Sequence, residues 1–344
     1  MFKQIITRHL RLIGLIVVIV IVALIPLFVH SPYYLDLLIM ILVNAMLAMT
    51  FIMMLRTGLI SLGIAAFWGV GSYSSTLLVM KLNLSFWLTL PASALITGVI
   101  ALCLGFPLIK NAGFSFVILT AVIGMIFVVA VGNIPFLGGY SGIANIPPPD
   151  PIRILFLPPQ EFVSKAQYFY LALFLFVVVV LICSAFYAAW TGRAWTAIGL
   201  NPRLAESLGI NVFRYRLLAF VVASGIAGLV GSYYAHYQSF IMPNTYGLFA
   251  TIYTQIYAIL GGIGYATLGP VVGAAVMTFF PEFMRITREV SPIFTGALLI
   301  LLIMFLPRGL LSLLDRRAVV TERIAKIAKA LESSLSTRRK MSKV

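Results

Sequence analysis

The sequence predicts an all-α integral membrane protein with about ten transmembrane helices, some of them short or broken. Of its 344 residues, 62% are hydrophobic and only 10% are charged, whereas soluble domains carry about 25% charged residues. The mean hydropathy is +1.08. About ten apolar runs approach the roughly 20 residues that a spanning helix needs. Together these observations exclude a soluble globular core.

The predicted spans follow one another with short polar connections. The first run is long and ends in a proline rather than at a small-residue cleavage site, so we interpret it as a retained span. Two spans are irregular: 247–261 is short, and 58–80 is interrupted by Gly63, Gly69 and Gly71. Broken or re-entrant helices occur only where protein or a water-filled path covers the freed backbone groups. The predicted spans are 12–29, 35–55, 58–80, 86–109, 114–132, 167–190, 217–238, 247–261, 266–281 and 292–306.

The basic residues indicate the orientation of these spans. If the N-terminus lies inside, only five of the 24 Lys and Arg residues fall on outer segments. The outer acids balance them, so the whole formal charge of +15 lies inside, as the positive-inside rule predicts. Both termini are then cytoplasmic. The outer bases are Lys81, Arg153, Lys165, Arg285 and Arg288, and the outer acids are Asp36, Asp150, Glu161, Glu282 and Glu289.

The sequence divides into a transmembrane domain of residues 1–314 and a tail of residues 315–344. Besides the inner loop, two segments lie outside the spans: the outer loop 133–166 and the tail. The outer loop 133–166 is rich in proline, which forbids regular helix, so we expect a stiff cap over the outer mouth or a contact with an external partner. The tail carries an apolar stripe among Lys and Arg residues. We expect it to lie as a helix on anionic inner-leaflet lipids rather than to bind nucleic acid. The stripe consists of Val320, Ile324, Ile327, Leu331 and Leu335.

The residue patterns of several enzyme and metal-site classes are absent from the sequence. It contains no G-x-x-x-x-G-K-[ST], H-E-x-x-H or G-x-S-x-G, so it lacks a P-loop for ATP and the commonest hydrolase motifs. Cys103 and Cys183 lie in apolar runs, and the histidines have no i,i+4 partner, so we expect no metal. Because the acids sit at span ends, an ion-driven carrier is also disfavoured. We expect no enzyme activity and no cofactor in this chain.

The candidate translocation path consists of uncharged polar side chains inside or beside the spans. Interhelical hydrogen bonding is the alternative role for each of them. The candidates are Asn44, Ser61, Ser72, Thr76 and Gln255. Gly269 and Gly273 form a GxxxG pattern, which lets helices approach closely, either within the chain or against a second membrane subunit.

A short helix is predicted in the inner loop 191–216. Asn201 can cap it, Pro202 suits the first helical position, and Gly209 suits the left-handed C′ position. The helix Pro202–Leu208 is too short to be stable alone in water, so it must pack against something. It is either part of a plain structured loop or a docking element for a soluble partner.

Several ordered blocks between residues 58 and 310 resemble the ABC importer permeases of the branched-chain amino acid type. Residues 58–73 (GLISLGIAAFWGVGSY) resemble that family's GxxSLGxAAFxGxGxY, and 197–211 (AIGLNPRLAESLGIN) resemble AIRxNxxxAExLGIN. Residues 138–147, 260–274 and 307–310 are similar to its outer loop, its glycine-rich LGG and GPVxGA stretch, and its closing PxGL. The sequence departs from the family at Leu59, Ile64, Gly199, Leu200 and Pro202.

The resemblance implies a translocation subunit of an ATP-driven importer in a bacterial or archaeal cytoplasmic membrane. Its expected partners are a second permease subunit (identical or a paralogue), two cytoplasmic ATPases that hold ATP-Mg, and an external solute-binding protein. The short inner helix would be the cytoplasmic coupling helix, with Asn201, Arg203, Ala205, Glu206 and Gly209 as ATPase contacts. The expected solute is a branched-chain or other hydrophobic amino acid. The alternatives are urea or short amides, or a stand-alone secondary carrier or channel.

Overall fold

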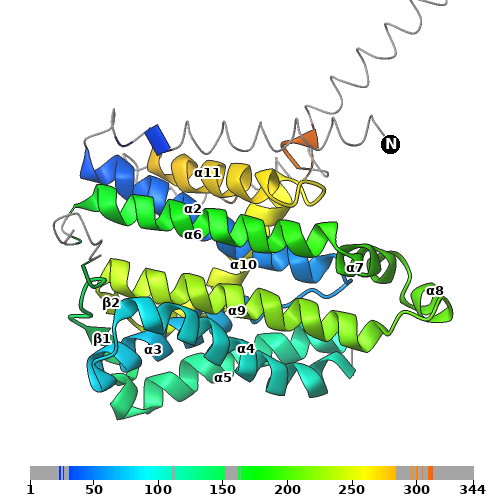
Figure 1. Ribbon diagram of the computed structural model, residues 1–344, viewed down its shortest axis with the longest axis horizontal. Coiled ribbons are helices and arrows are strands. Elements are labelled where there is room, and N and C mark those ends of the chain that lie inside the picture. Colours follow the sequence, from blue (N-terminus) through cyan, green and yellow to red (C-terminus); the bar gives the residue numbers. More distant parts are fainter. Residues whose placement is uncertain are drawn as a thin grey trace, which may run out of the picture.

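The computed structural model describes residues 31–110, 113–151 and 164–283, together with residues 23, 24, 26, 162, 296, 300, 304 and 309–312. Within these ranges the chain forms a bundle of long helices that run up and down between two ends (Figure 1). One end carries the short helices α7 (Trp190–Leu200) and α8 (Pro202–Ser207), and the other carries the two-stranded ladder β1–β2. The predicted spans 12–29 and 292–306 and the tail 315–344 fall mostly or wholly outside the described residues.

Five of the described helices are long and apolar enough to cross a membrane. They match the predicted spans 35–55, 86–109, 114–132, 167–190 and 217–238, and they agree with an all-α multi-pass membrane protein. The five are α2 (Pro32–Leu55), α4 (Phe86–Lys110), α5 (Phe114–Asn133), α6 (Lys165–Ala188) and α9 (Val212–Gln238).

The predicted span 58–80 differs from the observed helix α3 (Ile64–Leu82). Residues 56–63 are not helical, which agrees with the predicted interruption at Gly63. Helix α3, however, continues unbroken through Gly69 and Gly71. The expected breaks at these two glycines are therefore wrong. Both glycines serve close packing instead, because a side chain at Gly71 would collide with the backbone of Gly228 in α9.

Helix α9 is the centre of the bundle, with α3, α4 and α2 packed around it. Glycines make these approaches close: Gly231 of α9 lies against the Trp68 carbonyl of α3. The Ser72 hydroxyl bonds across the same contact to the Gly231 carbonyl at 2.9 Å. Because α9 joins α8 to β2, it connects the two ends of the bundle.

The predicted spans 247–261 and 266–281 are the short helices α10 (Leu248–Gly261) and α11 (Leu268–Phe283). They pack on each other and on α2. Side chains at Gly269 or Gly273 would collide with backbone atoms of Gly262 or Tyr257, so both glycines of the GxxxG pattern face the α10 region of the same chain.

The chain reaches α10 through an irregular segment rather than a full-length helix. After α9 it forms β2 (Phe240–Ile241) and the 3-10 helix η3 (Pro243–Tyr246). The strand β2 pairs antiparallel with β1 (Ile143–Ala144), with Ile143 opposite Ile241. In the described part of the outer loop, β1 follows the 3-10 turns η1 (Pro135–Leu137) and η2 (Gly139–Ser141).

Candidate coupling and translocation site

Helix α7 is an element that the sequence analysis missed, because its residues were assigned to the end of a span and to an inner loop. Its central residue Trp195 is fully buried and stacks on Phe186 of α6, with ring centroids 5.6 Å apart. The Trp195 indole N–H also donates to the Tyr215 carbonyl of α9 at 2.9 Å. These contacts fix α7 against two long helices and so give α8 a rigid base.

Helix α8 has the boundaries that its sequence predicts to within one residue. The Asn201 side-chain oxygen accepts the Leu204 backbone N–H at 3.2 Å, and Pro202 begins the helix. Gly209 ends it with a φ of +81°, the left-handed region that glycine enters without strain. Ala205 is buried against Ile198 of α7 and Val212 of α9. The short helix is thus stabilised by its own flanking helices.

The outward face of α8 mixes charge with exposed leucine. Asn201, Arg203, Glu206 and Gly209 are exposed, so four of the five predicted contact residues are accessible from outside, and Ala205 is buried. The sequence analysis missed Leu200, Leu204 and Leu208, which are 84%, 59% and 72% exposed. The four-residue spacing of Leu204 and Leu208 was the available signal, and Leu200 is the last residue of α7. We call Leu200, Leu204 and Leu208 the leucine face.

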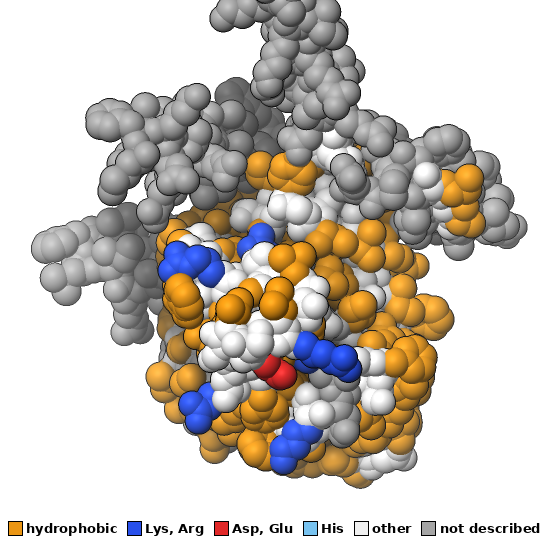
Figure 2. Space-filling view, turned by 90° about the vertical axis from the view of Figure 1, so that its right-hand side faces the viewer, with side chains coloured by type: hydrophobic (Ala, Val, Ile, Leu, Met, Phe, Trp, Pro, Cys, Tyr) orange, Lys and Arg blue, Asp and Glu red, His pale blue; other side chains and the backbone are white. Residues whose placement is uncertain are grey.

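Basic side chains surround this end of the bundle. The described residues there include Arg56, Lys110, Arg193, Arg203 and Arg214, with Glu206 as an acid among them. Figure 2 faces this end and shows several blue basic groups, one red acidic group and exposed orange apolar side chains between them. The surface is therefore basic and partly apolar.

Helix α7 is joined to the non-helical segment that precedes α3. Gly199 lies so close to the Arg56 carbonyl that any side chain there would collide with it. The Arg216 Nε–H of α9 donates to the Thr57 carbonyl at 3.1 Å. The Arg56 guanidinium in turn lies 4.0 Å from the centre of the Tyr187 ring of α6. A displacement of α7 must therefore press on the segment 56–63.

The far end of segment 56–63 lies inside the bundle, against α10 and α5. Gln255 of α10 donates its side-chain N–H to the Ser61 carbonyl at 3.0 Å. The Ala65 N–H donates to the Thr251 hydroxyl at 3.1 Å, and the Leu62 N–H donates to the Thr120 hydroxyl at 3.0 Å. The structure therefore brings two of the candidate path residues, Ser61 and Gln255, into direct contact.

The other candidate path residues lie elsewhere. Ser72 and Thr76 are fully buried in α3, and the Thr76 hydroxyl donates to the Ser72 carbonyl at 2.8 Å. The bond from Ser72 to the Gly231 carbonyl is an interhelical hydrogen bond, as the alternative role describes, whereas the Thr76 bond lies within α3. Asn44 is half-buried on α2.

A buried polar chain near the β1–β2 end was also missed. The His236 ring of α9 donates from Nδ1 to the Pro147 carbonyl at 2.7 Å, because a carbonyl can only accept. Its Nε2 lies 3.0 Å from the Ser75 hydroxyl of α3, which accepts from Ser232 at 2.7 Å. In the sequence, a single histidine among tyrosines is typical of an interfacial aromatic belt. The structure instead buries His236 completely and ties the outer loop to the bundle through it.

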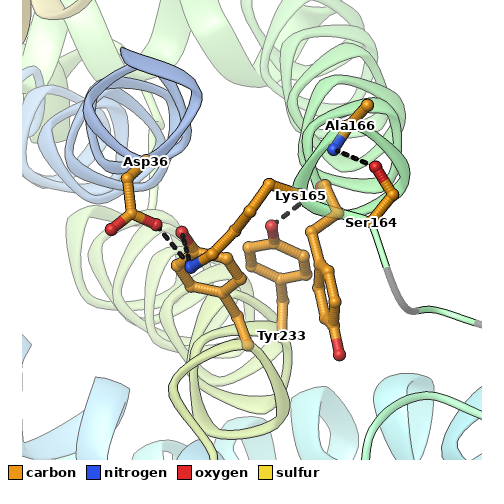
Figure 3. A network of polar contacts seen from close by, with 7 residues as sticks. Asp36, Ser164, Lys165, Ala166 and Tyr233 are labelled. Carbon is orange, nitrogen blue, oxygen red and sulfur yellow. Dashed lines mark hydrogen bonds and ion pairs between the residues drawn. The ribbon is translucent and has the colours of Figure 1, made fainter. Parts of the chain in front are cut away.

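Beside it, an ion pair joins the start of α2 to the start of α6 (Figure 3). The Lys165 ammonium lies 2.7 Å from the Asp36 carboxylate and donates to the Tyr237 hydroxyl at 3.2 Å. The Tyr233 hydroxyl donates to the Tyr168 carbonyl at 2.9 Å. Within the described ranges, no group of three His, Cys, Asp or Glu residues is placed to hold a metal ion.

Comparison with known proteins identifies a family and several relatives of this chain. The family described as "Branched-chain amino acid transport system / permease component" matches residues 33–306. The high-affinity branched-chain amino acid transport system permease protein LivM of Escherichia coli (strain K12) is 28% identical over 275 residues, 75% of this chain and 64% of LivM. The LivH permease protein of the same organism is 29% identical over 123 residues, 35% of this chain and 39% of LivH.

A further relative carries a different solute in its name. The autoinducer 2 import system permease protein LsrC of Photorhabdus luminescens is 26% identical over 249 residues, 70% of this chain and 68% of LsrC. No solved structure matches the chain. Because the family match covers most of the chain and every long described helix, the chain belongs to the family of ABC importer permeases described as the permease component of branched-chain amino acid transport systems.

Proposed function

We propose that this chain is the translocation subunit of an ATP-driven importer of branched-chain or other hydrophobic amino acids. The observation that carries the proposal is the continuous contact from α8 through α7 and Gly199 to segment 56–63, and from Ser61 to Gln255 of α10. A soluble partner that pushes on α8 would move backbone that lies inside the bundle. The chain itself would perform no chemistry.

The partner at α8 would be a cytoplasmic ATPase that holds ATP-Mg. An apolar patch ringed by charge is typical of a protein–protein contact, and the leucine face within a basic surface fits that description. Arg203, Glu206 and Gly209 lie on the exposed side of α8. Asn201 and Ala205 would act by holding the helix in shape, since Asn201 caps it and Ala205 is buried.

The importer would contain a second permease subunit and an external solute-binding protein. The two relatives in Escherichia coli, LivM and LivH, are both permease proteins of a high-affinity branched-chain amino acid transport system, which favours a paralogue as the second subunit. The binding protein would dock at the β1–β2 end. The complex would lie in the inner membrane with both termini cytoplasmic and the basic tail on anionic lipids.

Reconstitution into proteoliposomes tests this function. The chain would be combined with its paralogous permease, two ATPases and the binding protein, and uptake of radiolabelled leucine, isoleucine, valine and urea would be followed with and without ATP. We expect ATP-dependent accumulation of the amino acids and none of urea. Uptake by the permease without ATPases would contradict the importer proposal and favour a carrier or channel. Preferential uptake of urea would contradict the proposed amino-acid solute.

A further inference from the structure

The segment Met242–Gly247, which we call the α10 lead-in, packs against α5 and α3 although it is not an α-helix. Its Tyr246 ring is 6.3 Å from the Phe127 ring of α5 and 4.9 Å from the Trp68 ring of α3. Phe127 comes six residues before the end of α5 at Asn133, which is about 9 Å along the helix. Tyr246, near the end of the lead-in, therefore lies alongside a helix long enough to cross the hydrocarbon thickness of about 30 Å.

Irregular backbone at this depth cannot face lipid, because its free N–H and C=O groups would have no partners there. Along the lead-in, Pro243 and Tyr246 are buried whereas Met242 and Asn244 are exposed. An amide side chain such as that of Asn244 is also unfavourable in hydrocarbon. The exposed side of the lead-in therefore suits a water-filled path or another protein subunit better than it suits lipid.

Tyr246 of the lead-in and the two aromatic side chains that it contacts, Trp68 and Tyr73, carry buried polar groups without a hydrogen-bond partner. Among the described residues, the Trp68 indole N–H and the hydroxyls of Tyr73 and Tyr246 are buried without a partner. The Ser72 hydroxyl of α3 donates to the Trp68 and Gly231 carbonyls. An unpaired buried polar group costs about 1–3 kcal/mol. Three in one cluster indicate a place where another molecule supplies the missing partners.

The cluster depends on a missing side chain in α3. A Cβ atom at Gly69 would collide with the Phe127 ring and lie 2.9 Å from the Tyr246 ring. The rings therefore reach the α3 backbone only because residue 69 is glycine. The Tyr73 ring lies 6.1 Å from Tyr246, and the Tyr234 ring lies 4.7 Å from Trp68. We call Trp68, Tyr73 and Tyr246 the aromatic site.

We propose that the α10 lead-in and the aromatic site behind it hold the amino acid during translocation, an inference that rests on the proposed function. The rings would receive the apolar side chain, and a ring face attracts an ammonium group. The indole N–H and the two hydroxyls can donate to the carboxylate, and no side chain caps the N-terminus of α10 beside them. Such a site needs no charged side chain, and the charged residues of the described spans lie near helix ends.

Hydroxyl deletions separate a binding role from a packing role. Tyr73→Phe and Tyr246→Phe each remove only an unpartnered oxygen, so the melting temperature should stay the same or rise. At saturating loaded binding protein, we expect the maximal rate of leucine uptake to fall about tenfold in each variant. The ratio of leucine to valine uptake should also change. Ser224→Ala is the matched control, because it removes another buried, unpartnered hydroxyl, on α9 outside the aromatic site.

The measured uptake and melting temperatures show whether the aromatic site binds the solute. A loss of uptake in both tyrosine variants with wild-type melting and a normal Ser224→Ala control supports the site. Wild-type uptake and selectivity in both variants would overturn it. If a tyrosine variant does not fold, Trp68→Phe is measured in the same way and judged by the same selectivity ratio. Failure of the wild-type complex to import with ATP would instead overturn the proposed function.

Discussion

Gly199 of α7 lies directly against the backbone carbonyl of Arg56, at the point where α2 gives way to segment 56–63. Helices α7 and α8 protrude beyond the bundle at this end (Figure 1). The contact joins them to segment 56–63, in which the Ser61 carbonyl accepts a hydrogen bond from Gln255. A rigid link of this kind transmits displacement because packed backbone cannot be compressed.

Gly199→Val tests this link. The added side chain would separate α7 from Arg56, so the proposed coupling should be lost while the helices still insert. We expect ATP hydrolysis by the reconstituted complex to continue and uptake to fall at least tenfold. Gly264→Ala is the matched control, since a Cβ there meets nothing within 4 Å. Parallel losses of hydrolysis and assembly in Gly199→Val would show that the residue is needed for folding rather than for coupling.

Gly209 is expected to act through backbone conformation alone. Its φ is +81°, and a Cβ atom added there would meet nothing within 4 Å, so space is not limiting. A non-glycine residue in this region costs about 1–2 kcal/mol, and asparagine costs less. Uptake should therefore decrease in the order Gly209, Gly209→Asn, Gly209→Ala, Gly209→Val, with normal membrane insertion throughout. Equal uptake in all four proteins would remove Gly209 from the coupling element.

The leucine face should bind the ATPase. Leu204→Glu and Leu208→Glu place charge on side chains that are already exposed, so stability should change by less than about 0.5 kcal/mol. Copurification of the ATPase should be lost, because an unpaired charge would be buried in the contact. Glu206→Lys should weaken it through charge alone. Leu82→Glu, on an exposed leucine at the opposite end, is the control and should leave the complex intact.

Sequence reasoning succeeded where the signal was local. Asn201, Pro202 and Gly209 determine α8 through a cap, a fixed φ and a positive φ, all of which are properties of single residues. The five long spans were equally predictable, because about 20 apolar residues have few other stable arrangements in lipid.

The remaining features depend on residues distant in the chain. Helix α7 was missed because its stability comes from Trp195 packing on Phe186 of α6 and bonding to α9. Gly71 suggested a break because glycine is a poor helix former, but close contact with α9 favours glycine there. The leucine face was missed because a leucine at helical spacing is usually buried. None of these outcomes can be calculated from neighbours in sequence.

The two polar networks at the β1–β2 end should differ in their effect on stability. Asp36 and Lys165 are 46% and 42% exposed, so water screens their attraction and Asp36→Asn should cost less than about 1 kcal/mol. His236 is fully buried, and His236→Phe would leave the Ser75 hydroxyl and the Pro147 carbonyl without their shared partner, at a cost of about 2 kcal/mol.

Thermal unfolding of the purified protein in detergent would compare the two variants. His236→Phe should melt well below the wild type, and Asp36→Asn should melt close to it. The two substitutions lie in neighbouring networks at one end of the bundle, so a general weakening of that end would lower both melting temperatures alike. A larger decrease for Asp36→Asn would mean that the exposed ion pair, rather than the buried histidine, holds the outer loop region to the bundle.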